Sequence, residues 1–171
     1  MRIECSAERL QQAYVETEGA PAWSASRALI EKGELPSEMF RALAVAPGAL
    51  NALAAFGDVC YPGGRLERSI KERVIVAVSR QNTCQYCTVS HSRTMQRLGF
   101  SEDPAALTER ERLALTYAHA AILDANEIPE EVFADLRRVF DDEEIVELTL
   151  LVGLHAMLNL FNSALQVRYP E

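Results

Sequence analysis

The chain is short of positive charge. Its 171 residues include 17 Lys and Arg against 25 Asp and Glu, which gives a net charge of −8. Proteins that bind nucleic acid or anionic membranes need clustered Lys and Arg, so this balance argues against both kinds of partner. Aromatic residues make up only 7%, and the 8 Gly and 7 Pro are ordinary numbers. Collagen-like, low-complexity and wholly disordered chains are thereby excluded.

Cysteine is also scarce, with four residues in the chain. A chain of this length can bury a core without disulfides, so the cysteines are not needed as a scaffold. The first residues lack the apolar core of about 7–15 residues that marks a secretory signal. We therefore expect a cytoplasmic protein, in which free or transiently oxidised thiols are the default.

One long uncharged stretch, residues 148–167, is long enough to cross a bilayer. It contains polar side chains, including His155, Asn159 and Asn162, and each would need a partner at bilayer depth. We interpret it as a helix buried in the core or at a subunit interface. His155 is then expected to be a hydrogen-bonded core histidine, and the two asparagines to cap or cross-link helices.

The segments between the Gly- and Pro-rich breaks are rich in Ala, Leu, Glu and Arg, and alternating apolar patterns are nearly absent. These features predict an all-α fold. The apolar run Val74–Val78 could be a buried strand, but its flanks lack turn residues and its spacing favours an interior helix. The expected helices span residues 5–17, 24–32, 37–46, 48–59, 66–81, 84–98, 108–124, 129–139 and 141–167.

A Cys-x-x-Cys pair, Cys84 and Cys87, is followed by His91. Residues three and four apart share one face of a helix, so these side chains form a stripe that continues through Met95 and Leu98. Two cysteines at this spacing near a helix start can close a disulfide, and a helix N-terminus and a histidine both stabilise the reactive thiolate. The pattern indicates thiol redox chemistry.

Glu72 projects from an otherwise apolar helical face. A buried carboxylate is costly unless it is paired or protonated. Pairing with His91 would satisfy it, orient the imidazole and raise its basicity. The alternative is that Glu72 is a solvated glutamate on the helix surface, as most glutamates are.

The spacing of Glu72, Cys84, Cys87 and His91 resembles that of the AhpD-like alkylhydroperoxidases of the carboxymuconolactone decarboxylase superfamily. The resemblance is strongest over residues 66–100. It implies an all-α, AhpD-like helical domain that oligomerises and reduces hydroperoxides through its thiols. Residues 1–171 would form one such domain, with an N-terminal helical extension at 1–35 and a core at 36–171 that carries the Cys-x-x-Cys helix at 84–98.

The resemblance also implies roles for single residues. Cys87 would attack the peroxide, Cys84 would resolve the product and exchange with a reductant, and Glu72 with His91 would relay protons. The helix dipole by itself favours Cys84 as the thiol of lower pKa, so that assignment stays open. Better-studied relatives carry a second histidine between the cysteines, where this chain has Tyr86.

The expected function is therefore that of a thiol-dependent peroxidase without cofactor or metal. Its expected partners are a small hydroperoxide and a dithiol reductant of the lipoyl or thioredoxin type, or a peroxiredoxin, and we expect a homo-oligomer. Three alternatives remain: a disulfide-exchange adaptor, a carboxymuconolactone-type decarboxylase, and a zinc-stabilised helical module. The thiol pair and His91 would supply only three zinc ligands.

Overall fold

The computed structural model describes residues 1–169 and is all-helical over that range, as predicted. It contains nine α-helices and two short 3₁₀ helices, and no strand within the described residues. The α-helices are α1 (Ala7–Glu16), α2 (Ser24–Glu31), α3 (Glu38–Ala44), α4 (Ala49–Cys60), α5 (Arg68–Gln81), α6 (Gln85–Arg97), α7 (Glu109–Leu123), α8 (Glu130–Leu136) and α9 (Asp142–Ala164). The 3₁₀ helices are η1 (Pro21–Trp23) and η2 (Pro104–Ala106).

Local capping chemistry sets several of the helix ends. Thr108 and Glu111 form a reciprocal capping box at the start of α7, and Asp141 and Glu144 form another at the start of α9. Gly99 follows α6 with a φ of 73°, a left-handed conformation that glycine adopts without steric cost. These signals are short-range, and the boundaries expected from them agree with the observed ones.

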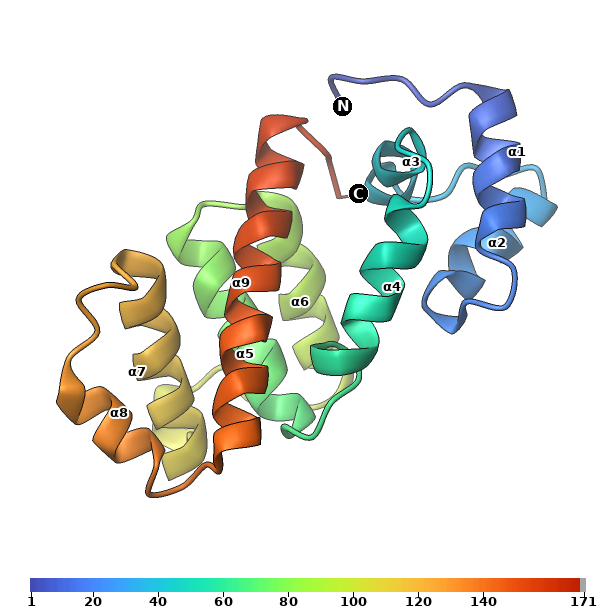
Figure 1. Ribbon diagram of the computed structural model, residues 1–171. Helices are drawn as coiled ribbons and strands as arrows, with labels where there is room; N and C mark the ends of the chain where they lie inside the picture. The colour runs from blue at the N-terminus through green and yellow to red at the C-terminus, as the bar shows by residue number, and fades with distance from the viewer. Residues whose placement is uncertain (170–171) are drawn as a thin grey trace.

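The centre of the molecule is α5, which packs against α6, α7 and α9 (Figure 1). Its apolar run Val74–Val78 is helical, so the strand alternative is wrong. Buried residues line almost every side of this helix, which explains why its centre is apolar all round. In Figure 1, α7 and α8 lie to one side of this core and α1 to α4 to the other.

The long helix α9 is the one single helix of the described chain that is apolar and long enough to span a bilayer, with a mean hydropathy of 1.5. It packs against α4, α5, α6 and α7, and its inward face buries His155, Asn159 and Asn162. The opposite face exposes Val146 and Leu160. This packing supports the interpretation of a core helix with an apolar outer face.

The N-terminal segment packs on α3 and the start of α4, where it shares a second hydrophobic cluster. Trp23 contacts Phe40 edge to face, with ring centroids 5.6 Å apart, and its indole N–H donates to the backbone oxygen of Leu50 at 2.9 Å. Treating residues 1–35 as an extension of a core at 36–171 stays a prediction, and the last two residues of that core lie outside the described range.

A buried ion pair fixes the loop between α4 and α5. The ammonium of Lys71 lies 2.7 Å from a carboxylate oxygen of Glu147, and both side chains are almost fully buried. Glu147 also accepts the backbone N–H groups of Arg65, at 2.6 Å, and of Leu66, at 3.2 Å. Because the loop runs from Tyr61 to the start of α5, this clamp holds the segment that enters the candidate site.

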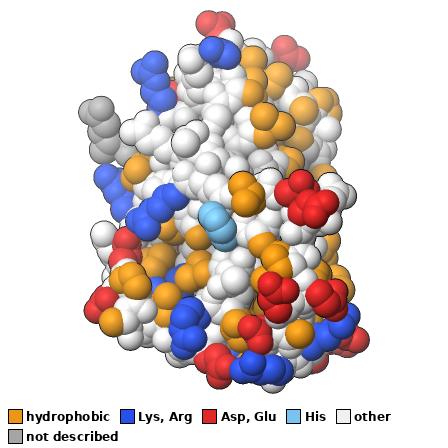
Figure 2. Space-filling model, turned by 90° about the vertical axis from the view of Figure 1, so that its left-hand side faces the viewer, with side chains coloured by type: hydrophobic (Ala, Val, Ile, Leu, Met, Phe, Trp, Pro, Cys, Tyr) orange, Lys and Arg blue, Asp and Glu red, His pale blue; other side chains and the backbone are white. Residues whose placement is uncertain are grey.

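Charges of both signs are mixed on one face of the molecule. Figure 2 shows acidic and basic side chains interspersed on the face that includes α7 and α8, with no block of one sign. The acidic excess is therefore not gathered into one patch on this face.

Candidate functional site

A buried carboxylate–imidazole pair lies at the heart of the site. Glu72 on α5 is fully buried, and its Oε2 lies 2.8 Å from Nδ1 of His91 on α6. The predicted pairing is confirmed, and the alternative of a solvated Glu72 is wrong. Glu72 is buried because α5 lies at the centre of the molecule, where even its polar side chains face neighbouring helices.

Two further residues, which the sequence reasoning missed, bind the other oxygen of Glu72. The hydroxyl of Tyr61 donates to Oε1 at 2.9 Å, and Nε of Arg68 donates to it at 2.7 Å. Arg68 also donates to the Tyr61 hydroxyl at 2.9 Å. The i,i+4 spacing of Arg68 and Glu72 could have indicated that contact. Nothing in the sequence pattern points to Tyr61, which arrives from the loop after α4.

These contacts decide the ionisation of the pair. Burial by itself would raise the pKa of Glu72, but the hydrogen bond and charge of His91, together with Tyr61 and Arg68, outweigh it and hold the pKa below its ordinary value. Burial, and then the charge of Glu72, raises the pKa of Tyr61. Glu72 is therefore an anion at neutral pH, and Tyr61 is a protonated hydrogen-bond donor.

The two cysteines meet at the start of α6. Cys84 is the N-cap residue, and its sulfur accepts the backbone N–H of Cys87 at 3.3 Å. The pair is joined as a disulfide, with Cα atoms 5.5 Å apart. Both residues are buried, as the predicted inward stripe requires. Leu98, at the end of that stripe, is 48% exposed, because it caps the helix after the core has ended.

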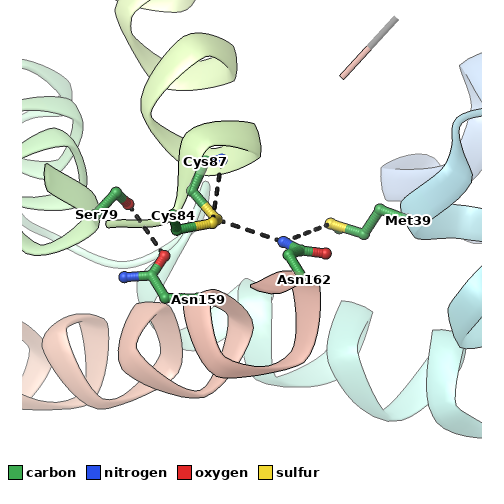
Figure 3. Close-up of a disulfide and its surroundings, with 6 residues drawn as sticks. All are labelled: Met39, Ser79, Cys84, Cys87, Asn159 and Asn162. Atoms are coloured by element: carbon green, nitrogen blue, oxygen red, sulfur yellow. Dashed lines mark hydrogen bonds between the residues drawn. A yellow bond between two sulfur atoms is a disulfide. The ribbon is translucent and has the colours of Figure 1, made fainter. Parts of the chain in front are cut away.

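Asn162 on α9 contacts the Cys87 sulfur directly (Figure 3). Its amide nitrogen lies 3.3 Å from Sγ of Cys87 and 3.8 Å from Sδ of Met39. One turn earlier, Asn159 accepts the hydroxyl of Ser79 at 3.1 Å. The expected cross-linking role is thus observed, and at Asn162 one partner is a cysteine sulfur.

A cavity of about 480 Å³ opens beside these groups. Its polar lining includes Tyr61, Arg68, Cys87, His91 and His155, and much of the remaining wall is apolar. A second hollow of about 390 Å³ is lined by Cys84. Cys84 thus borders one hollow and Cys87 the other, and Tyr86 and Asn162 line both.

His155 departs from its expected role. It is 2% exposed, and neither ring nitrogen has a hydrogen-bond partner among residues 1–169. The prediction of a hydrogen-bonded core histidine is therefore wrong, because the surrounding rings of Tyr61 and His91 meet it edge to face and leave its nitrogens unengaged.

The arrangement of ligand-type residues also bears on the zinc alternative. In the described part of the chain, no group of three or more His, Cys, Asp or Glu is placed to hold a metal ion. His91 is engaged by Glu72, and Cys84 and Cys87 are joined to each other. The geometry thus gives the zinc-stabilised module no support.

Comparison with known proteins matches part of the chain to a family. Residues 47–131 match the model of the carboxymuconolactone decarboxylase family. The uncharacterized protein YnjA of Escherichia coli is 27% identical over 122 residues, which are 62% of this chain and 67% of YnjA.

Two solved structures share the fold. A structure described as an alkylhydroperoxidase AhpD core, from an uncharacterized peroxidase-related protein of Ralstonia eutropha JMP134, superposes with a TM-score of 0.74 at 20% identity, covering 99% of this chain and 92% of the other. The debrominase Bmp8 superposes with a TM-score of 0.69 at 18% identity over the same shares. At these identities the two structures support only the similarity of the fold. The matched family model and the shared fold together support the AhpD/carboxymuconolactone decarboxylase superfamily for this chain.

Proposed function

We propose that this protein is a thiol-dependent peroxidase that reduces small organic hydroperoxides. The observation that carries the proposal is the shared cavity: Cys87 lines it together with His91, and His91 is paired with the buried carboxylate of Glu72. A nucleophile and a base thus line one cavity that a substrate can enter, and the group that orients the base contacts it from the protein interior.

The proposed cycle begins with the reduced pair. The Cys87 thiolate attacks an oxygen of R–O–O–H, so that an S–O bond forms, the O–O bond breaks, and the leaving oxygen takes a proton to give the alcohol. The resulting sulfenic acid condenses with the Cys84 thiol, which releases water and forms the disulfide. An external dithiol then reduces the disulfide by exchange and is itself oxidised.

The proposed proton relay follows from the contacts of Glu72. Whenever His91 carries a single ring proton, the Glu72 anion accepts that proton from Nδ1, which leaves Nε2 as an acceptor. Nε2 would take the thiol proton of Cys87 and return it to the leaving oxygen. Tyr61 and Arg68 hold the carboxylate in place from its other side.

Single-turnover kinetics test this function. Reduced protein is mixed with cumene hydroperoxide, and the loss of thiols and of peroxide is followed together. We expect stoichiometric consumption by wild type and by Cys5→Ser, a control that removes a thiol lying outside the cavity. Cys87→Ser should abolish consumption, and Cys84→Ser should stop at the sulfenic acid. Unchanged consumption by Cys87→Ser would refute the proposal.

The reductant side has its own proposal. A hollow lined by Cys84 but not by Cys87 adjoins the substrate cavity, which suits exchange of Cys84 with a lipoyl or thioredoxin-type dithiol. The adaptor alternative, with a peroxiredoxin as partner, predicts turnover with a protein disulfide and a negligible rate with peroxide alone. A carboxymuconolactone-type decarboxylation would leave the thiol pair without a role.

Assembly and location complete the proposal. Val146, Met157 and Leu160 expose apolar side chains on the outer face of α9, and their burial between copies would favour a homo-oligomer. Light scattering checks this, and a monomer at micromolar concentration would contradict it. We propose a cytoplasmic location, because a reducing compartment keeps such a pair in its dithiol form between turnovers.

A further inference from the structure

One buried side chain in the cavity has no part in the mechanism above. His155 lies on α9 and lines the cavity together with Cys87 and His91. Its ring centroid is 5.4 Å from that of Tyr61 and 5.2 Å from that of His91, both edge to face. Neither of its nitrogens has a hydrogen-bond partner in the described range.

Burying the His155 imidazole costs free energy unless a hydrogen-bond partner satisfies its nitrogens. A buried polar group without a partner destabilises a fold, and an aliphatic side chain would fill the same space without that penalty. Buried polar groups are nearly always satisfied, so an unsatisfied imidazole that lines a cavity needs an explanation. A ligand held in the cavity supplies one.

We propose that His155 is a substrate-binding residue, whose ring N–H donates a hydrogen bond to the peroxide oxygen of an apolar organic hydroperoxide held in the cavity. The proposal rests on the proposed function and specifies its substrate class. Leu53, Leu154 and Leu158 line the same cavity and would pack against the organic group.

The chemistry of the ring fits this role. Burial first, and then the neighbouring charge of His91, lowers the pKa of His155 well below its ordinary value, so the ring is neutral at pH 7. A neutral imidazole carries one N–H donor and one acceptor nitrogen. As the O–O bond breaks and the S–O bond forms, negative charge develops on the leaving oxygen. His155 would stabilise that charge by its hydrogen bond, while the proton itself comes from His91.

Binding to the oxidised, unreactive protein tests the inference without any turnover. The probes are 2-phenyl-2-propanol, the alcohol formed from cumene hydroperoxide, and isopropylbenzene, which has the same carbon skeleton without the hydroxyl. Trp23 lines the cavity and is the only tryptophan in the chain, so its fluorescence reports binding. Wild type should prefer the alcohol by about 3–10-fold, the value of one net hydrogen bond.

Two substitutions sharpen the test. His155→Leu should abolish the preference for the alcohol and leave affinity for the hydrocarbon unchanged or higher. His155→Gln, which keeps an N–H donor, should restore part of the preference. His155→Leu should also melt at a temperature no lower than wild type, because it removes an unsatisfied buried group. A residue retained only for packing would show the reverse, with a lower melting temperature and an unchanged preference.

The outcomes separate the two proposals. If wild type does not distinguish the probes, or if His155→Leu keeps the preference, the role of His155 is overturned even where peroxide is consumed. If the preference depends on His155 but reduced wild type consumes no peroxide, the peroxidase function fails while the residue stands as a binding group for oxygen-bearing apolar ligands.

Discussion

Replacing Glu72 by glutamine removes the charge behind His91 while leaving the shape of the side chain. The carboxylate receives two donors on Oε1, from Tyr61 and Arg68, and faces Nδ1 of His91 with Oε2. A glutamine has one oxygen and one NH₂ group. The oxygen must face the two fixed donors, so the NH₂ group turns towards His91.

This arrangement changes the tautomer of the His91 imidazole. With an N–H pointing at it, Nδ1 of His91 must accept, and the ring proton moves to Nε2. Nε2 then no longer takes a proton from Cys87. A carboxylate-to-amide change that traps the wrong histidine tautomer in serine-protease triads costs about 10⁴ in rate. General-base catalysis contributes about 10²–10⁴-fold, and we expect Glu72→Gln to lower the rate of the peroxide reaction by that range.

The stability loss should be much smaller. Glutamine still accepts hydrogen bonds from Tyr61 and Arg68, although these become weaker because the acceptor is neutral. Since Arg68 is about one-third exposed, water screens part of the lost ion pair. We expect the free energy of unfolding to fall by about 1–3 kcal/mol.

The same substitution also changes the response to acid. The pKa of Glu72 in the fold lies below its ordinary value, so the folded state binds this proton less readily than the unfolded chain does. Its contribution to stability is therefore complete above the unfolded pKa and is lost as the pH falls through the folded pKa. Glu72→Gln carries no titrating proton there, so its stability should depend less steeply on pH on the acid side.

A matched control is available in Glu111. It is buried, pairs with Nε of Arg73 at 2.9 Å, and does not line the cavity. Glu111→Gln should lose comparable stability and retain the rate. Stopped-flow measurement of thiol loss and denaturant titration of all three proteins give both quantities. If Glu72→Gln reacts within about threefold of wild type, well inside the range expected of a lost general base, the relay is refuted.

Three further substitutions probe other parts of the structure. Asn162→Leu removes the N–H that contacts the Cys87 sulfur, which should destabilise the thiolate of the reduced protein and slow its alkylation by iodoacetamide at pH 7 by about 3–10-fold. Lys71→Met leaves the carboxylate of Glu147 buried without its cation, and denaturant titration should show a loss of about 3–5 kcal/mol. Trp23→Ala widens the cavity wall and should raise KM for cumene hydroperoxide more than for hydrogen peroxide, as steady-state kinetics would show.

Each of these has a result that would count against it. An unchanged pH profile of alkylation in Asn162→Leu would mean that its amide does not stabilise the thiolate, and Asn159→Leu, whose residue does not contact the cysteine, is the control. A Lys71→Met protein as stable as wild type would contradict the burial of an uncompensated charge. Equal changes in KM for the two peroxides would show that Trp23 does not select for the organic group.

Much of the fold follows from local sequence. The capping box at Thr108 and Glu111 and the stop at Gly99 act within one helical turn, so they mark boundaries without knowledge of the rest of the molecule. The run Val74–Val78 was the ambiguous case, because a short apolar run is typical of a buried strand and of a buried helix alike. Its helical spacing and the lack of flanking turn residues favour the helix that the structure shows.

Some residues of the candidate site could likewise be predicted from local sequence, and others could not. Cys84, Cys87 and His91 lie within one helical stretch, and the apolar surroundings of Glu72 on its own helix predicted that it would be buried and paired. The prediction for His155 is wrong, because the general tendency of buried histidines to find partners does not take account of the cavity that opens beside this one.

The sequence alone determined the helices, the redox pair and the carboxylate that needed a partner. Helical geometry makes residues three and four apart neighbours whatever surrounds them, so these features can be recognised from spacing. Only the tertiary structure decided that α9 delivers Asn162 to the cysteine and His155 to the cavity, and that the loop after α4 delivers Tyr61 to Glu72. Those contacts join segments far apart in the chain, and they depend on how whole helices pack, which no local spacing records.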